Sequence, residues 1–165
     1  MEKFGLLMDL GKVRMSADPR LVTFTRRNRA RLVFCNGGIT DANFSNQSRI
    51  LKPGDELGVR VFRQVVPGKT TAEERLEFCR RLEGNVFVGA QGVLPIFQQK
   101  RDKLPKGLRY NSFDNKECLW KDSSGCYGMP SLVALSRGGF NFDISCFENP
   151  LDDRDAFFSF RVLSV

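Results

Sequence analysis

A glycine-rich segment in the middle of the chain has a composition suited to binding a phosphate group. Gly89, Gln91 and Gly92 lie between a predicted strand at 85–89 and a predicted helix that begins near Val93. Backbone N–H groups in such a turn, and the N-terminus of the helix that follows, favour a bound anion. The segment lacks the Lys-Ser/Thr pair of a P-loop and the three-glycine spacing of a dinucleotide site. Two interpretations stay open: a phosphate site, or glycines that only allow a tight turn.

Two groups of basic residues are candidates for binding an anionic partner or nucleic acid. The first group is Arg26, Arg27, Arg29 and Arg31. It lies between segments 20–25 and 30–35, whose β-branched and aromatic residues predict two strands, so we expect three of these arginines on a hairpin loop. The second group is Lys100, Arg101 and Lys103. It falls at the end of a predicted helix, where cations also complement the helix dipole without any ligand.

The absence of histidine excludes several kinds of chemistry. The chain has none, so Ser-His-Asp and Cys-His activation and most zinc sites are ruled out. The acidic loop at 152–155 lacks the spacing of a calcium loop. An odd number of cysteines without a CxxC pair predicts reduced thiols rather than a disulfide framework or a zinc site; these are Cys35, Cys79, Cys118, Cys126 and Cys146. We therefore expect no metal and no cofactor, and no catalytic residue can be named.

Length and charge indicate one basic domain. The 165 residues, of which 41% are hydrophobic and 27% charged, match a single globular domain over 1–165. A net charge of +7 favours anionic partners, although such a charge also serves solubility. No apolar stretch approaches the ~20 residues that cross a bilayer, and the first residues do not resemble a signal peptide. We expect a cytoplasmic protein without a membrane partner, and homo-oligomers stay open.

The predicted elements indicate an α+β fold. Thr71 and Glu74 have the spacing of a capping box, and Gly84 suits the end of the helix they begin. A second helix is predicted over 93–103. Alternating or apolar runs predict strands at 57–66, 85–89, 108–113, 117–121, 131–136, 140–147 and 156–163. We expect an antiparallel or mixed sheet of several short strands packed against two consecutive helices from 70–104.

Five runs of the sequence resemble a set of short bacterial hypothetical proteins, some of which travel on mobile gene cassettes. These runs are EERLEF at 73–78, VGAQG at 88–92, QKRDKLPKG at 99–107, SFD at 112–114 and LWKD at 119–122. The resemblance implies a bacterial, cytosolic origin. It implies no activity, and no functional residue is carried over from it.

Because proton-transfer and zinc-binding groups are scarce, the sequence favours a non-enzymatic binding module for an anionic or macromolecular partner. Two alternatives stay open. One is a nucleic-acid-binding protein. The other is a small enzyme acting on a phosphorylated or anionic metabolite, which would need a cavity joining the 89–92 turn to a carboxylate with a raised pKa.

Overall fold

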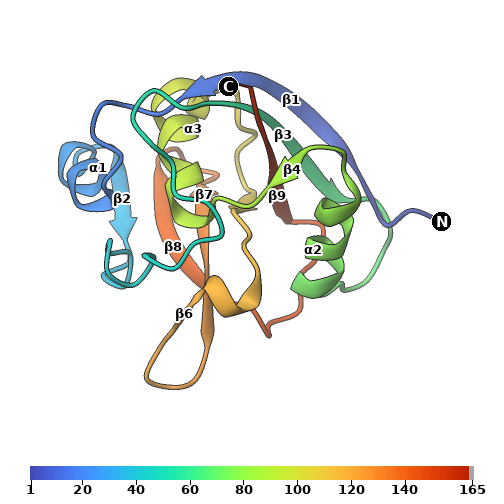
Figure 1. Cartoon of the computed structure of the whole chain (residues 1–165). Coiled ribbons are helices and arrows are strands. Elements are labelled where there is room, and N and C mark those ends of the chain that lie inside the picture. The colour runs from blue at the N-terminus through green and yellow to red at the C-terminus, as the bar shows by residue number, and fades with distance from the viewer. Residues whose placement is uncertain (164–165) are drawn as a thin grey trace.

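The computed structural model describes residues 1–163, in which one mixed nine-stranded sheet is combined with three α-helices (Figure 1). The strands are β1 (Phe4–Arg14), β2 (Leu32–Cys35), β3 (Glu56–Gln64), β4 (Asn85–Val86), β5 (Arg109–Asn111), β6 (Trp120–Lys121), β7 (Tyr127–Ala134), β8 (Phe140–Cys146) and β9 (Asp155–Val162). The α-helices are α1 (Leu21–Arg27), α2 (Ala72–Arg81) and α3 (Val93–Lys100). Short 3-10 turns are η1 (Gly89–Gly92), η2 (Arg101–Lys103) and η3 (Lys116–Cys118). The fold is α+β, and none of the described helices is long and apolar enough to cross a membrane.

The strand order leaves β2 at one end of the sheet. The order is β1-β3-β9-β5-β7-β8-β2, with β4 added beside β9 and β6 beside β7. β9 pairs in parallel with β5, and β8 pairs in parallel with β2. The other described neighbours in this order are antiparallel. Because β2 pairs with β8 on one side, its second edge has no strand beside it among the described residues.

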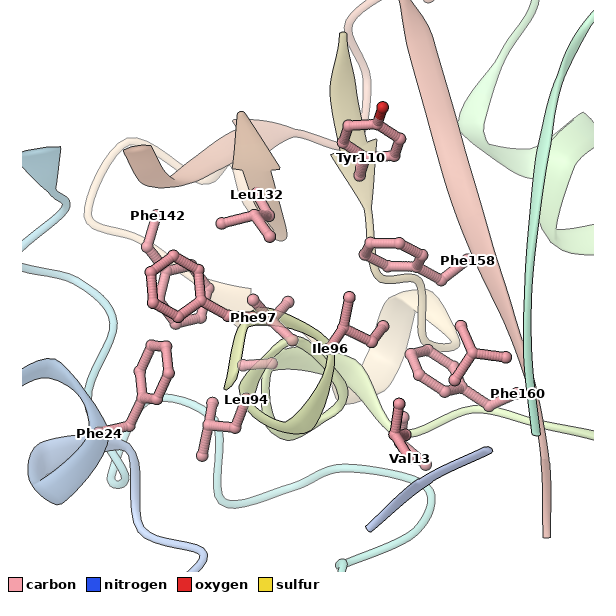
Figure 2. Close-up of a cluster of buried hydrophobic side chains, with 14 of the residues drawn as sticks. Val13, Phe24, Leu94, Ile96, Phe97, Tyr110, Leu132, Phe142, Phe158 and Phe160 are labelled. Carbon is pink, nitrogen blue, oxygen red and sulfur yellow. The ribbon is translucent and has the colours of Figure 1, made fainter. Parts of the chain in front are cut away.

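The larger core lies where the sheet curls around α3. Figure 2 shows α3 nearly end-on, with side chains from β1, β9, β5, β7 and β8 directed toward it. The Phe97 ring of α3 lies 5.5 Å from that of Phe24 in α1, which in turn lies 5.8 Å from Phe142 in β8. The Gln99 side chain accepts from the backbone N–H of Arg14 at 2.9 Å and donates to its carbonyl at 2.6 Å. These two bonds fasten the end of β1 to α3.

The second core lies between α2 and the opposite face of the sheet. Successive strand residues point to opposite faces, so Phe158 belongs to the first core and Phe157 to the second. Leu76 and Cys79 of α2 are buried in the second core. The helix begins as predicted, because the Thr71 side chain accepts from the Glu74 N–H and the Glu74 side chain accepts from the Thr71 N–H.

The predicted strand at 20–25 is wrong, and so is the hairpin that included it. Residues Leu21–Arg27 form α1, so the described chain has three α-helices instead of the two consecutive ones expected. β-branched residues favour strands locally, but Leu21 and Phe24 are buried at helical spacing, and tertiary packing outweighs that preference. The Asp41 carboxylate also accepts from the Leu21 N–H at 2.6 Å and the Val22 N–H at 3.2 Å. This long-range cap satisfies N–H groups that a helix start leaves unpaired.

The expectation of five unpaired thiols is also wrong. Cys126 and Cys146 form a disulfide, with their Cα atoms 5.6 Å apart. The antiparallel pairing of β7 with β8 places Gly128 directly opposite Cys146, and Cys126 comes only two residues before Gly128. The strand pairing therefore brings the two cysteines close together. Cys35, Cys79 and Cys118 are free.

Candidate functional site

A groove between α1 and the free edge of β2 is the strongest candidate for a functional site. It has a volume of about 720 Å³ and is lined by α1, by β2 and by the loop that follows β2. In Figure 1, α1 lies on the side of β2 away from β8. Residues of the helix and of the strand therefore line one groove together.

The helical wall of the groove follows from the spacing of residues in α1. Leu21 and Phe24 face the core. Val22, Arg26 and Arg29, with the half-buried Thr25, line the groove. Positions 22, 26 and 29 are separated by four and three residues, so they share one face of the helix and its final turn. The groove therefore combines apolar and cationic side chains on one wall.

Hydrogen bonds hold the turn that leads from α1 into β2. The buried Asn28 donates from its side chain to the Phe24 carbonyl at 2.9 Å. The Asn28 carbonyl in turn accepts from the N–H groups of Arg31 and Leu32. The position of Arg29 is thus fixed at a tight turn and not at a hairpin tip.

Large apolar side chains are exposed on both walls of the groove. Val33 is 61% exposed and Phe34 is 48% exposed, while Val22 across the groove is 51% exposed. Two consecutive residues, Val33 and Phe34, are exposed because a register irregularity falls between Leu32 and Phe34 in the pairing with β8. Contiguous exposed apolar residues with a polar rim are typical of interaction sites.

The groove is positively charged. Arg26, Arg27, Arg29 and Arg31 are all exposed, and within residues 1–163 none of them forms an ion pair. Arg26 and Arg29 line the groove itself. The groove's carboxylate, Asp41, is already bonded to the start of α1. The arginines are therefore available to an anionic partner.

The thiol in the groove is poorly suited to nucleophilic chemistry. Burial, and then the nearby Asp143 carboxylate, raise the pKa of the Cys35 thiol above its ordinary value. The thiol therefore stays protonated at neutral pH, whereas the thiolate is the reactive form.

The second basic group lies at the end of α3. The Arg101 guanidinium lies 5.0 Å from the Phe97 ring centroid and donates to the Phe97 carbonyl at 3.0 Å. These contacts give Arg101 a structural role at the helix terminus. Lys100 and Lys103 flank it in α3 and η2, and none of the three is among the described residues that line the groove. Their binding of an anion stays a prediction.

The glycine-rich turn is packed into the interior. A Cβ on Gly92 would lie 2.5 Å from Val88 and 2.6 Å from Phe160, so close packing requires glycine there. Gly89 has a positive φ of 58° and lies under Gln47. The Gln91 side chain is bonded to the Leu51 N–H and the Pro19 carbonyl. This packing accounts for the residue types, and phosphate binding at Gly89, Gln91 and Gly92 stays a prediction.

A second, more polar cavity of about 400 Å³ lies near the turn before β9. Its cations are already paired: Lys69 and Arg154 contact Asp152 at 3.1 and 3.2 Å, and Arg109 lies 3.9 Å from Asp155. Arg154, then Lys69, hold the pKa of the Asp152 carboxyl well below its usual range. Within the described chain, no cluster of three or more metal-ligating side chains is found.

A third cluster contains a buried carboxylate. Burial raises the pKa of Asp114. Ser48 donates to it from both its hydroxyl and its N–H, and the Asn115 N–H donates to it at 2.7 Å. Cys118 Sγ lies 3.5 Å from Ser48 Oγ. Both carboxylate oxygens are occupied, which ties the loop at 45–50 to the segment after β5.

Sequence reasoning missed Val22, Val33, Phe34 and Asp41 as site residues. The first three were assigned to strands of a hairpin, although the helical spacing of positions 22, 26 and 29 was present in the sequence. No local signal indicates that Asp41 caps a helix 20 positions earlier along the chain.

Comparison with models of known protein families, with curated proteins and with solved structures finds no match to this chain.

Proposed function

We propose that the protein is a non-enzymatic binding module whose α1–β2 groove holds an anionic macromolecular partner. The observation that carries the proposal is the meeting of unpaired arginines with exposed apolar residues in one groove. Arg26 and Arg29 supply the charge, and Val22, Val33 and Phe34 supply the apolar surface. Apolar anchors with cations at their rim are the usual composition of a macromolecular interface.

Two further features support binding over the enzyme alternative. That alternative needs a cavity joining the 89–92 turn to a carboxylate with a raised pKa. Asp114 has a raised pKa, but both of its oxygens accept hydrogen bonds from neighbouring residues. The turn itself is packed beneath Gln47 and around Phe160.

The test is binding of fluorescein-labelled heparin, a polyanion, measured by fluorescence anisotropy at low salt. We expect binding by the unaltered protein and about tenfold weaker binding by R26E/R29E, because exposed charge pairs contribute up to about 1 kcal/mol each. The matched control is K52E/R161E, which changes the net charge equally at two exposed residues outside the groove.

Two results contradict the proposal. One is no binding of heparin by the unaltered protein. The other is equal weakening by R26E/R29E and K52E/R161E, which would mean that net charge alone causes the binding. Circular dichroism and thermal unfolding of each variant establish that it is folded.

A further inference from the structure

We infer that the partner is an acidic, extended polypeptide segment that lies along β2 and adds a strand to the sheet. This inference rests on the proposed function and specifies the class of partner. The surface that leads to it is the free edge of β2, which no other described strand covers.

The edge of β2 offers backbone groups for strand pairing. The Asn36 N–H donates to the Phe142 carbonyl of β8. Because backbone N–H and C=O groups alternate in direction along a strand, those of Cys35 point away from β8. Neighbouring strands lie about 4.8 Å apart, so an added segment needs open space beside the edge. The groove of about 720 Å³ between α1 and β2 provides that space.

Apolar residues on both walls of the groove can contact such a segment. A strand added between a sheet edge and a helix forms main-chain hydrogen bonds to the edge, while pockets beside it select alternate side chains. Here Val33 and Phe34 lie beside one side of the space and Val22 beside the other. Apolar side chains of the segment would contact these three residues.

The charge of the groove selects acidic residues in the segment. Arg26 and Arg29 line the groove without an ion pair in the described chain, and Arg27 and Arg31 are exposed close by in sequence. Glutamate or aspartate residues in the partner would pair with them. Complementary charge of this kind raises association rates and suppresses wrong partners.

The same charge disfavours a second copy of this chain. The protein carries a net charge of +7, and two copies joined through β2 would bring like-charged arginine groups together. Charged residues beside an exposed edge are a known means of preventing self-pairing of strands. Nucleic acid would satisfy the arginines, but it has no backbone complementary to the β2 edge.

The experiment uses a fluorescein-labelled heptapeptide of alternating glutamate and valine, titrated with the full chain at low salt. Three control ligands separate the contributions. A heptapeptide with lysine in place of glutamate tests charge. The acidic heptapeptide N-methylated at every residue tests backbone pairing, because it keeps the side chains and loses the N–H donors on both of its edges. A DNA duplex tests the class of partner.

We expect the acidic heptapeptide to bind at least tenfold more tightly than either altered peptide. We also expect R26E/R29E to weaken its binding about tenfold and K52E/R161E to leave it within twofold. Equal binding of the N-methylated peptide, or of the lysine peptide, overturns the inference.

Failure of the inference can be distinguished from failure of the proposed function. If the duplex or heparin binds through Arg26 and Arg29 while no peptide does, the proposed function stands and the peptide inference is wrong. If no anionic probe binds, both are wrong. Sedimentation that shows dimers through β2, lost on a Val33→Glu substitution, assigns the edge to a second copy and also overturns the inference.

Discussion

Removing the Asp41 carboxylate should loosen α1 and thereby the groove. The carboxylate accepts from two N–H groups at the start of the helix, at 2.6 and 3.2 Å, and no side chain at the N-cap position does so. Replacing a capping residue by alanine costs about 0.5–2 kcal/mol. We expect D41A to lower the free energy of unfolding by about 1–2 kcal/mol, with a fall in Tm of about 2–4 °C per kcal/mol in a chain of this size.

The assay is urea denaturation followed by circular dichroism, with amide hydrogen exchange as a local readout. The matched control is D153A, which removes an exposed carboxylate that caps no helix. D41N keeps one acceptor oxygen and should lose less stability than D41A. The Asn28 amide, which bonds to the Phe24 carbonyl, should exchange faster in D41A. If D41A and D153A have the same stability and the same exchange at Asn28, Asp41 does not fix α1 and the reasoning is refuted.

Three further predictions concern the core, the cysteines and a buried acid. G92A should lose about 1–3 kcal/mol of stability in thermal or urea unfolding, because its Cβ would lie 2.5 Å from the Val88 side chain. An unchanged free energy of unfolding would contradict this packing. Thiol titration of the denatured, unreduced protein should find three free thiols, and five would mean that Cys126 and Cys146 are unpaired. The pKa of Asp114 is raised by burial, so the folded state binds the proton more tightly and stability falls as pH rises from the ordinary carboxyl range through the raised pKa. D114N should remove this part of the pH dependence in urea unfolding. Identical pH profiles for D114N and the unaltered protein would exclude a contribution of Asp114 to the pH dependence.

Elements set by local interactions could be predicted from the sequence. The capping box of Thr71 and Glu74 lies within four residues, so the start of α2 was predicted correctly. The aromatic-rich run that forms β9 and the end of α3 near η2 are local in the same way, although β9 is buried on both faces and not on one as its alternation predicted.

Elements set by distant contacts could not be predicted. α1 depends on Asp41 and on burial of Phe24 against Phe97, while its own residues favour a strand. β1 was missed because register shifts at Leu6/Met8 and Asp9/Gly11 disturb the alternation of its buried residues.

In the candidate site, too, local features could be predicted and long-range contacts could not. The arginines were found from their residue type and spacing alone. Their place in a groove depends on the pairing of β2 with β8, more than 100 residues later in the chain. The paired cysteines likewise meet through the alignment of β7 with β8.

The most direct test of binding at the groove is an amide chemical-shift titration of the isotope-labelled protein with the acidic heptapeptide. The α1–β2 groove predicts that shift changes concentrate in α1, in β2 and in residues 36–41, and that R26E/R29E diminishes them. Changes that instead centre on Lys69, Arg109 and Arg154 around the second cavity, or no changes at all, would contradict the assignment of the groove as the binding site.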